Sequence, residues 1–574
     1  MVAVQLANCS ECPPEVATRP PAPADPAIHH SILKAVAVPI HFERPITEPP
    51  VVSWNPVTWQ PEGTALGRLR ASARRSLMRI SADFLQMLSR TARAAGMTLP
   101  EPDPDGLTAD STPLLLTGHQ PVIFHPGLVY KYQLTESVAA SRSCRAVALI
   151  IDSDEGDPGG FEVPELAAVS SDQPTHYSHV SPLRCRTGSF SGGSGLYMAC
   201  RLAPRDRLSE ITAAVEASLL SAGCPEAATS FSAAASAYVR LPEELPMVTA
   251  NTLVRRAAGI GAQMAELPLT TVCGLSEVSV FFSELLAAAE DFHRTYNRVL
   301  DNWRQQQGIR NDANPFPSLR CTPNALELPF WLLDTSRGTR SVAWLHGIQP
   351  GNSGGRSIGN EHSQITEMQR GFEAETLLSL RFAGQLLVPR GALITATLRL
   401  LFSDLFIHGL GGGRYDPATD QLIRQWWRET PPPFAVASAS MCLFPNERTS
   451  VRQLQQFRDQ YRDLQFNPGR YLDQPVFSRP QAAEIGRLLV EKQAAVEELQ
   501  QHRSAGASGR ETGRRIQQLS DTIRSRVADI LRPQLEAANA ISEETTRIIE
   551  SRTWPWFYFP ELQHTSGRGT WPGD

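Results

Sequence analysis

The sequence has no hydrophobic run long enough to cross a membrane and no excess of positive charge. Its apolar runs fall far short of the roughly 20 residues that a membrane helix needs, and its start, MVAVQLANCSECPP, lacks the basic region of a signal peptide. A net charge of -5 gives no reason to expect binding to nucleic acid or to membranes. We therefore expect a cytoplasmic protein whose partners are neither nucleic acids nor membranes.

Cysteines are few and scattered, which argues against a disulfide framework. Nine of them, an odd number, lie between Cys9 and Cys442. Cys9 and Cys12 form one CxxC pair, which offers two ligands where a zinc ion needs four, so we assign no metal to it. With 574 residues and 41% hydrophobic residues, the chain is long and apolar enough for a large domain with appendages.

Composition and periodicity divide the chain into four parts. Residues 1–60 are proline-rich and aperiodic, which predicts an extended or disordered tail unless it packs on the body. Residues 60–475 alternate apolar runs with amphipathic stretches. Residues 478–552 carry two apolar stripes with 3/4 spacing on either side of the turn SAGASG, which predicts an antiparallel hairpin of coiled-coil type. Residues 553–574 begin with an aromatic cluster that should dock on the core.

The core is organised around one predicted strand–helix–strand unit. The run Leu114–Thr117 and the run Ala146–Ile151 have no polar interruption, and a helical pattern opens at Pro126 between them. Such runs are typical of parallel strands that are covered on both faces. We therefore predict an α/β fold, a Rossmann-like parallel sheet with insertions, whose ligands bind beyond the carboxyl ends of the strands.

The remaining pattern predicts further elements. These are a helix at 65–95 with an arginine-rich, solvated face; a strand at Leu269–Cys273; one long helix from Ser276 to Gln307; an antiparallel pair at Leu326–Leu333 and Ser341–Leu345; a mobile glycine-rich lid at Gly351–Gly359; and a return to the core sheet at Leu386–Pro389, Asp404–His408 and Phe434–Phe444.

The first candidate constellation follows the first strand and comprises Thr117, Gly118, His119, Gln120, His125 and Gly127. A glycine lets a ligand approach the backbone, and the next helix start attracts phosphate or carboxylate. Two histidines here either contact phosphate oxygens or shuttle protons near neutral pH. The alternative is a turn in which the His and Gln side chains only cap backbone groups.

The second constellation is the acidic cluster after the second strand, in which Asp152 and Asp154 lie nearest the strand. Carboxylates at this place bind a ribose hydroxyl, a substrate amine or Mg²⁺. The alternative is a solvated acidic loop. Although these carboxylates and the two histidines are metal-ligand types, their spacing is not diagnostic, and no metal site is assigned.

The third constellation follows the run that ends at Ile407 and comprises His408, Gly409, Gly411, Arg414, Tyr415 and Asp416. The glycines form a predicted backbone cradle, and Arg414 is a forked donor for carboxylate or phosphate. The alternative is a tight turn in which Arg414 and Asp416 form a structural pair. Because parallel strands end at a common edge, we expect His119 and Arg414 to lie in loops that face each other across one crevice.

These three stretches resemble the cysteine ligase family of bacillithiol biosynthesis, the cysteine-adding enzymes. The family has Thr-Gly-Gln-Gln where this chain has Thr117 to Gln120, and Ile-Ala-Ser-Glu-Asp-His-Asp where this chain has Ile151 to Asp157. Its Phe-Ile-Gly-Gly-Pro-Gly and following Tyr are similar to the stretch from Phe406 to Tyr415. The resemblance implies a Rossmann-like core, a coiled coil that makes a homodimer, and ATP-dependent joining of cysteine to the amine of a small substrate.

The chain departs from the family at three places, and one of them is Pro126-Gly127, where the family has Gly-Pro. His119 replaces a glutamine, and Gly156 stands where the acidic motif has a histidine. The resemblance implies that ATP or ADP phosphates, or an activated carboxylate, lie at the loop Gly118–Gly127. It also implies an amine, ribose or Mg²⁺ at Asp152 and Asp154. The competing interpretation is a non-catalytic scaffold that keeps the crevice and assembles through its coiled coil.

Overall fold

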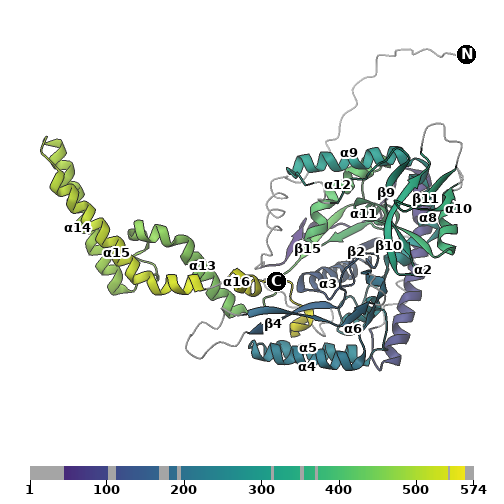
Figure 1. Ribbon diagram of the computed structural model, residues 1–574, viewed down its shortest axis with the longest axis horizontal. Helices are drawn as coiled ribbons and strands as arrows, with labels where there is room; N and C mark the ends of the chain where they lie inside the picture. The colour runs from purple at the N-terminus through teal and green to yellow at the C-terminus, as the bar shows by residue number, and fades with distance from the viewer. Residues whose placement is uncertain are drawn as a thin grey trace, which may run out of the picture. The chain divides into compact units, whose positions relative to one another are not determined.

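The computed structural model describes residues 44–100, 112–166, 180–190, 195–311, 316–348, 355–368, 373–540 and 543–562. The described part is a mixed α/β fold (Figure 1). None of its helices is both long and apolar enough to span a membrane.

A six-stranded sheet forms the centre of the fold. Its order is β1 (Ile46–Glu48), β15 (Phe434–Ser438), β14 (Leu405–His408), β2 (Leu114–His119), β3 (Arg145–Ile150) and β8 (Ala265–Pro268). Only β1 runs antiparallel to its neighbour, and the other five strands are parallel. The pairing of β2 with β3, joined by α3 (Pro126–Ser141), confirms the predicted strand–helix–strand unit.

The chain changes direction within this sheet between β2 and β14. From β2 it moves outward to β3 and β8, and it then returns to the other side of β2 and moves outward through β14 to β15. In the register of this pair, Thr117 lies opposite Ile407. The segments that follow β2 and β14 therefore leave the same edge and diverge, and ligands of open α/β sheets bind at such a point.

Helices cover both faces of the sheet, which explains why its strands are uninterrupted apolar runs. Leu115 and Ala148 belong to a buried cluster with α3, α4 (Arg205–Ser221), α5 (Pro225–Arg240) and α6 (Met247–Ala257). The residues between them on the strands, such as Leu116 and Val147, face the other cluster. That cluster includes α2 (Thr64–Ala94), α8 (Ser276–Ala287), α9 (Ala289–Gln307), α11 (Ala392–Leu401) and α12 (Leu410–Trp426).

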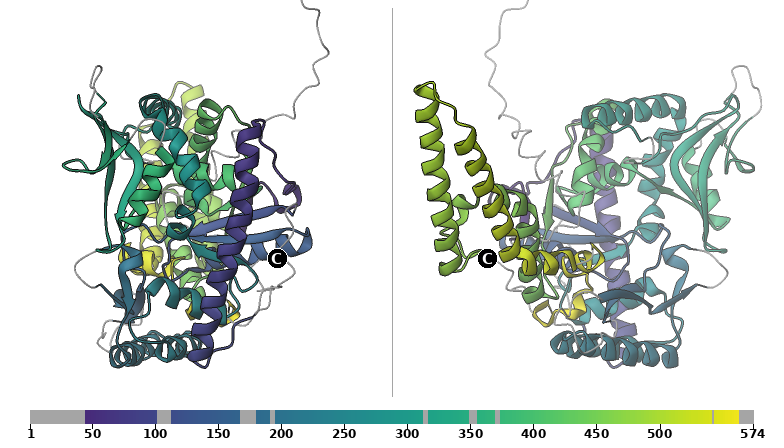
Figure 2. Two further views of the ribbon diagram at one scale, coloured as in Figure 1. Left: turned by 90° about the vertical axis from the view of Figure 1, so that its right-hand side faces the viewer. Right: turned by 60° about the vertical axis from the view of Figure 1, so that its left-hand side comes forward.

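Helix α2 was correctly predicted, but its arginine-rich face is not uniformly solvated. Figure 2 shows α2 as one long helix along the body. Arg70 and Arg74 are buried and bind Asp404, which is fully buried, at 2.6 and 2.7 Å. Asp404 also accepts hydrogen bonds from the Leu114 and Trp59 amides. The arginines therefore join α2 to the start of the sheet, and the prediction of a solvated face is wrong for these two residues.

A second, antiparallel sheet lies in the segment between β8 and β14. Its order is β12 (Gln364–Met368), β11 (Arg356–Gly359), β10 (Thr339–His346), β9 (Ala325–Asp334) and β13 (Gln385–Pro389). The pairing of β9 with β10 confirms the predicted antiparallel pair. Strand β13 pairs with β9, so the prediction that Leu386–Pro389 returns to the core sheet is wrong. Arg356–Gly359 of the predicted lid form β11, and residues 351–354 lie outside the described residues.

Two further predictions fail next to β8. Leu269–Cys273 is the short helix α7, and the strand is the preceding Ala265–Pro268. A short apolar run fits a strand and a buried helix equally well, and here the strand includes the charged Glu266, which hides it from a hydrophobicity pattern. The predicted single helix from Ser276 to Gln307 is divided into α8 and α9 at Ala288 (φ -118°, ψ 38°).

Smaller elements complete the body. They are two antiparallel ribbons, β4 (Gly160–Leu166) with β5 (Val180–Arg186) and β6 (Gly188–Phe190) with β7 (Cys200–Leu202), and the helix α10 (Glu373–Phe382). Within the part predicted as a tail, β1 pairs with β15, and Trp54 is buried. Residues 44–60 therefore follow the alternative in which the segment packs on the body.

The C-terminal region is helical: α13 (Pro445–Phe466), α14 (Arg479–Ser504), α15 (Arg510–Ala540) and α16 (Glu543–Ile549). Helix α14 packs along α15, and Pro533 lies inside α15. Leu464 of α13 shares a buried cluster with Ile485, Ile523 and Val527. Helix α13 thus belongs to the same packing unit as the predicted pair, upstream of the boundary at 475.

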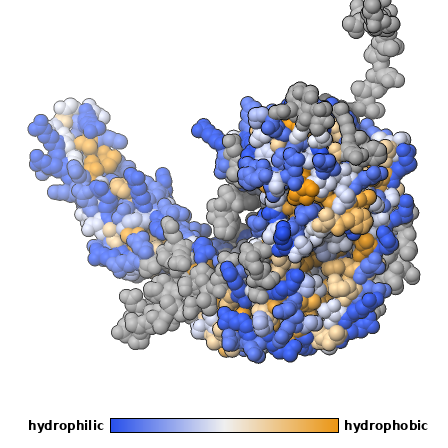
Figure 3. Space-filling model, turned by 45° about the vertical axis from the view of Figure 1, so that its right-hand side comes forward, coloured by the Kyte–Doolittle hydropathy of each residue, from blue (hydrophilic) through white to orange (hydrophobic). Residues whose placement is uncertain are grey.

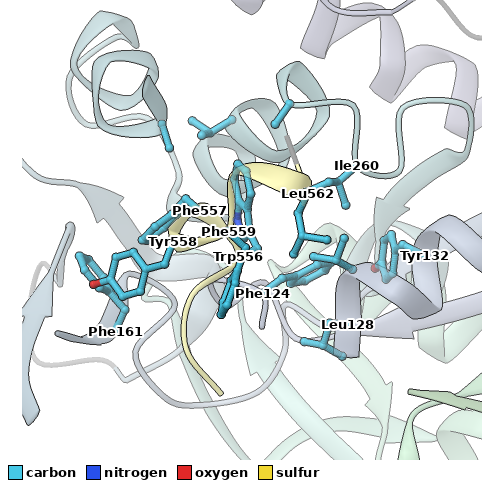
Figure 4. Close-up of a cluster of buried hydrophobic side chains, with 14 of the residues drawn as sticks. Phe124, Leu128, Tyr132, Phe161, Ile260, Trp556, Phe557, Tyr558, Phe559 and Leu562 are labelled. Carbon is cyan, nitrogen blue, oxygen red and sulfur yellow. The ribbon is translucent and has the colours of Figure 1, made fainter. Parts of the chain in front are cut away.

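The aromatic segment after α16 is part of the main core. Trp554, Trp556, Phe557, Tyr558, Phe559 and Leu562 are all buried. Figure 4 shows this segment among side chains from several elements. The Phe557 ring lies edge-on to Phe161 at 5.3 Å, and the Trp556 amide donates to the Phe124 carbonyl oxygen at 2.8 Å. This last bond joins the C-terminal segment to the loop after β2. Residues 563–574 lie outside the described residues.

Candidate functional site

The loop between β2 and α3 is held by its own histidine. The His125 Nδ1 atom accepts a hydrogen bond from the Gly127 amide at 3.1 Å and so caps α3. A Cβ atom on Gly127 would lie 2.7 Å from Ser438 Oγ, so this glycine permits close packing of α3 on the end of β15. The helix start is therefore already satisfied, as the capping alternative predicted, and Gly127 has a packing role.

A buried lysine that sequence analysis missed supports the end of β2. The Lys131 ammonium donates to the Gly118 carbonyl oxygen at 2.8 Å and is only 1% exposed. Burial lowers the pKa of Lys131 to about 7. Thr117, also buried, donates from Oγ1 to the Ile407 carbonyl oxygen at 2.8 Å and so ties β2 to β14. The sequence does contain a signal for this buried lysine, because Lys131 lies between two tyrosines in a helix with few polar residues.

His119 and His125 do not titrate near neutral pH, so that prediction is wrong. Burial lowers the pKa of His119 to about 3, and the charge of Lys131 contributes. Burial also lowers the pKa of His125 to about 3, with contributions from Arg552, His119 and Lys131. Both rings are therefore neutral at pH 7. His119 Nδ1 lies 3.2 Å from the Gln120 carbonyl oxygen, and because a carbonyl only accepts, Nδ1 carries the proton and Nε2 is an acceptor.

The two carboxylates after β3 have different partners. Asp152 is 4% exposed and accepts hydrogen bonds from the amide and the hydroxyl of Thr270 at the start of α7. Burial raises the pKa of Asp152 to about 6, although the bonds from Thr270 oppose this shift. Asp154 accepts from the Gln120 side chain at 3.1 Å and from Arg340 at 3.2 Å. Gln120 thus joins the loops after β2 and β3.

Arg340, another residue that sequence analysis missed, comes from the second sheet. Its guanidinium donates to the Ser153 carbonyl oxygen at 2.8 Å and lies 3.3 Å from a carboxylate oxygen of Glu155. It also stacks over the Trp331 ring at 4.0 Å. Arg340, which belongs to the second sheet, therefore holds the acidic loop in place. The alternative of a solvated acidic loop does not describe these residues. Among the described residues, no group of three or more His, Cys, Asp and Glu side chains is arranged to hold a metal ion.

Gly156 occupies a position that a histidine cannot take. Its φ of +152° is a conformation that side chains rarely adopt, and a Cβ atom would lie 2.5 Å from Tyr197 Oη. The Gly156 amide also donates to the Gly195 carbonyl oxygen at 2.9 Å. The local packing thus requires a glycine at this position.

The glycine-rich stretch after β14 is a helix start and not the predicted open loop. Gly409 is the N-cap of α12, without a side chain to cap it, and Gly411 and Gly412 lie in the first turn. Cβ atoms on Gly409 and Gly411 would meet no atom within 4 Å, so the space around both is open. Gly413 instead packs tightly on Val436 of β15. A strand directly followed by an open helix start is a favourable place for an anion.

The charged residues of this stretch are not paired as the turn alternative expected. Asp416 binds Arg399 at 2.7 Å and His408 at 2.9 Å. Arg414 lies over the Tyr415 ring at 5.8 Å, and within the described residues it has no hydrogen bond or ion pair. Tyr415 in turn lies edge-on to Trp303 at 5.9 Å. Arg414 is therefore available for a ligand, whereas Asp416 has a structural and orienting role.

The sheet brings the three predicted constellations to one edge. The loop after β2 and the start of α12 after β14 leave adjacent parallel strands, and the acidic loop follows β3 on the other side of β2. These features define a mixed α/β protein with polar groups gathered at a switch point of its parallel sheet. Compared with protein-family models and with curated proteins, the chain matches none.

Proposed function

We propose that this protein is an ATP-dependent ligase that joins an amino acid, such as cysteine, to a small amine substrate. We also propose that its core is Rossmann-like, because β8, β3, β2, β14 and β15 follow the order 3-2-1-4-5 of the parallel strands. The observation that carries the proposal is the uncapped start of α12 at the switch point, with the unpaired Arg414 in the next turn of the same helix.

Two helix starts lie at this edge, and they differ in what they offer an anion. The first turn of α3 is capped by His125, whereas α12 has Gly409 at its cap and a 17-residue dipole behind it. The open space at Gly409 and Gly411 leaves room for a phosphate or carboxylate group. Arg414 supplies a charge-assisted, forked donor. We therefore assign the nucleotide phosphates or the activated carboxylate to α12 rather than to the loop Gly118–Gly127.

The acidic loop would receive the opposite charge. Asp154 keeps its oxygens within reach of Gln120 and Arg340, at the end of the strand next to β2. A substrate ammonium, a ribose hydroxyl or a hydrated Mg²⁺ ion is the chemistry that such carboxylates bind. His119 Nε2, a neutral acceptor, would face donors of the same substrate. A ligase of this kind works in the cytoplasm, where ATP is supplied.

We further propose a homodimer through a coiled coil formed by α14 and α15. Figure 3 shows the surface of these helices as mainly hydrophilic with small hydrophobic patches. Val490 of α14 is 71% exposed, which leaves apolar surface for a second copy. In a two-helix hairpin each helix buries only one apolar stripe. Packing against a second copy would bury more apolar surface and so add stability.

A non-catalytic scaffold is the second candidate, and Gly156 is the observation that favours it. The cysteine ligase family that the chain resembles has a histidine at this position. That side chain would not fit here, because Tyr197 occupies the space it would need. A chain that had lost the chemistry would keep the sheet, the helix starts and the helical pair.

Calorimetric titration of the full chain with ATP and ADP decides between the two candidates. The ligase predicts saturable binding that Arg414→Ala weakens at least tenfold, as the loss of a charge-assisted ligand contact does. Arg424→Ala is the matched control, because Arg424 lies on the same helix with its side chain 57% exposed. If the wild-type chain does not bind either nucleotide at millimolar concentration, the scaffold is the better description.

A further inference from the structure

His408, the last residue of β14, is held in one orientation by charged neighbours. Its Nε2 atom lies 2.9 Å from Asp416 Oδ2, and the Arg399 guanidinium binds the same oxygen at 2.7 Å. Burial opposes the charge of Asp416, but Arg399, His408 and Thr419 outweigh it and keep the pKa of this carboxyl below its usual value. A carboxylate only accepts hydrogen bonds, so Nε2 of His408 carries the proton.

The second nitrogen of this ring is directed at the start of α12. A Cβ atom built on Gly412 would lie 2.5 Å from His408 Nδ1, whereas Gly412 itself is exposed in the first turn. The rings of Phe406 at 4.5 Å and Phe434 at 5.6 Å hold the imidazole from its sides. With Nε2 protonated, Nδ1 has a lone pair. Because Gly412 has no side chain, no Cβ atom covers this nitrogen, although His408 as a whole is only 8% exposed.

We propose that His408 is the proton acceptor of the crevice, with Asp416 as its positioning residue and Gly412 as the opening that admits the substrate. This proposal rests on the proposed ligase function. The substrate class is a primary amine that attacks the carbonyl carbon of an acyl group activated by ATP as an acyl phosphate. As the C–N bond forms, the C–O bond to phosphate breaks, and the phosphate leaves with the electron pair. The proton of the attacking nitrogen passes to His408 Nδ1 and then to solvent.

Other bases at this edge are engaged or weak, because burial lowers the pKa of His119 and of His125 to about 3. His125 Nδ1 caps α3, and Asp152 is bound by two donors of Thr270. Asp154 is paired with Arg340. His408 differs from these groups because its one engaged nitrogen is fixed by Asp416, while its other nitrogen points to the place that we assign to the activated acid. An orienting carboxylate behind a histidine is the arrangement that general-base catalysis uses.

Chemical labelling of the full chain tests the geometry without any assumption about turnover. Diethyl pyrocarbonate acylates accessible, unprotonated imidazole nitrogens, and mass spectrometry locates the product. His408 should be labelled in the wild type and in Gly411→Ala, because a Cβ atom at 411 meets nothing within 4 Å. Gly412→Ala should abolish the labelling of His408. An unlabelled His408 in the wild type, or equal labelling in Gly412→Ala, overturns the proposal.

Turnover tests the chemical role. With ATP, cysteine and glucosamine as the amine, His408→Ala should lower kcat by roughly a hundredfold or more while ATP binding persists. Asp416→Asn should shift the pH profile of kcat/KM, which a purely structural role would not do. If His408→Ala turns over as fast as the wild type, His408 is not the proton acceptor. If wild type labels at His408 but neither binds ATP nor forms product, the ligase fails while the accessible, oriented base stands.

Discussion

Arg340 of β10 lies 3.2 Å from Asp154, although the two residues are 186 positions apart in the chain. One comes from the antiparallel sheet and the other from the loop after β3 of the parallel sheet. The side chain of Arg340 is only 12% exposed, so the pair is shielded from solvent more than a surface ion pair is. This contact makes the second sheet a wall of the candidate site.

Arg340→Ala should loosen the acidic loop without unfolding the protein. The Ser153 carbonyl oxygen and the Asp154 carboxylate both lose a donor, so amide exchange at residues 152–157 should accelerate. Arg337→Ala, in the same hairpin with its side chain 81% exposed, is the control and should leave that exchange unchanged. Hydrogen exchange followed by mass spectrometry measures both, and unchanged protection in Arg340→Ala contradicts the role.

Asp404→Asn should be among the most destabilising single changes in the chain. The carboxylate is fully buried and neutralises Arg70 and Arg74, which would be left without a counter-charge. Breaking a buried pair in this way costs about 3–5 kcal/mol. Urea denaturation should show a much lower midpoint, whereas Asp459→Asn on the exposed face of α13 should keep the wild-type midpoint. A small effect at Asp404 would show that the arginines find other acceptors.

Asp152→Asn should raise stability at neutral pH and not in acid. Burial raises the folded pKa of Asp152 from 3.8 to about 6, so the folded state takes up the proton first as pH falls. The penalty for the buried charge is fully present above pH 6 and disappears below about pH 4. Asparagine removes it, which should stabilise the fold by about 1–3 kcal/mol at pH 7. The difference in free energy of unfolding between Asp152→Asn and the wild type should shrink to zero between pH 6 and pH 4. A difference that stays constant over this range contradicts the raised pKa of Asp152.

His119→Ala and Arg414→Ala should each weaken nucleotide or substrate binding with little loss of stability. Arg414 acts through charge, so its contribution should fall as salt rises. His119 is neutral, with a pKa of about 3, so the loss on its removal should be the same at pH 6 and at pH 8. Cys144→Ala, directly before β3, is the control and should bind as the wild type does. Titration calorimetry at two pH values checks the prediction, and wild-type affinity in both variants refutes the site.

The helical pair should determine the oligomeric state. Deletion of residues 480–550 should leave a monomer, and Val490→Glu should have the same effect because it buries a charge in the proposed interface. Gln500→Glu adds the same charge at another exposed position of α14 and should leave the dimer intact. Sedimentation velocity distinguishes the species, and a wild-type chain that sediments as a monomer ends the dimer proposal.

Several elements were predictable because local patterns determine them. The uninterrupted runs that became β2 and β3 indicated strands covered on both faces, and the helix at Pro126 between them required a parallel connection. The 3/4 stripes of α14 and α15 indicated two helices, and the aromatic cluster from Trp554 to Phe559 indicated burial. Each of these depends on periodicity or composition within a few tens of residues.

The tertiary structure alone decided which polar groups are free. Arg70 and Arg74 look like a solvated helix face in sequence, yet Asp404, more than 300 positions away, buries them. Burial is likewise why His119 stays neutral, and a distant arginine, Arg340, is why Asp154 is paired. A pKa and a hydrogen-bond partner depend on atoms within a few ångströms in space. Residue spacing along the chain therefore located the edge of the sheet at which we propose the site, while long-range contacts determined the chemical state of each side chain there.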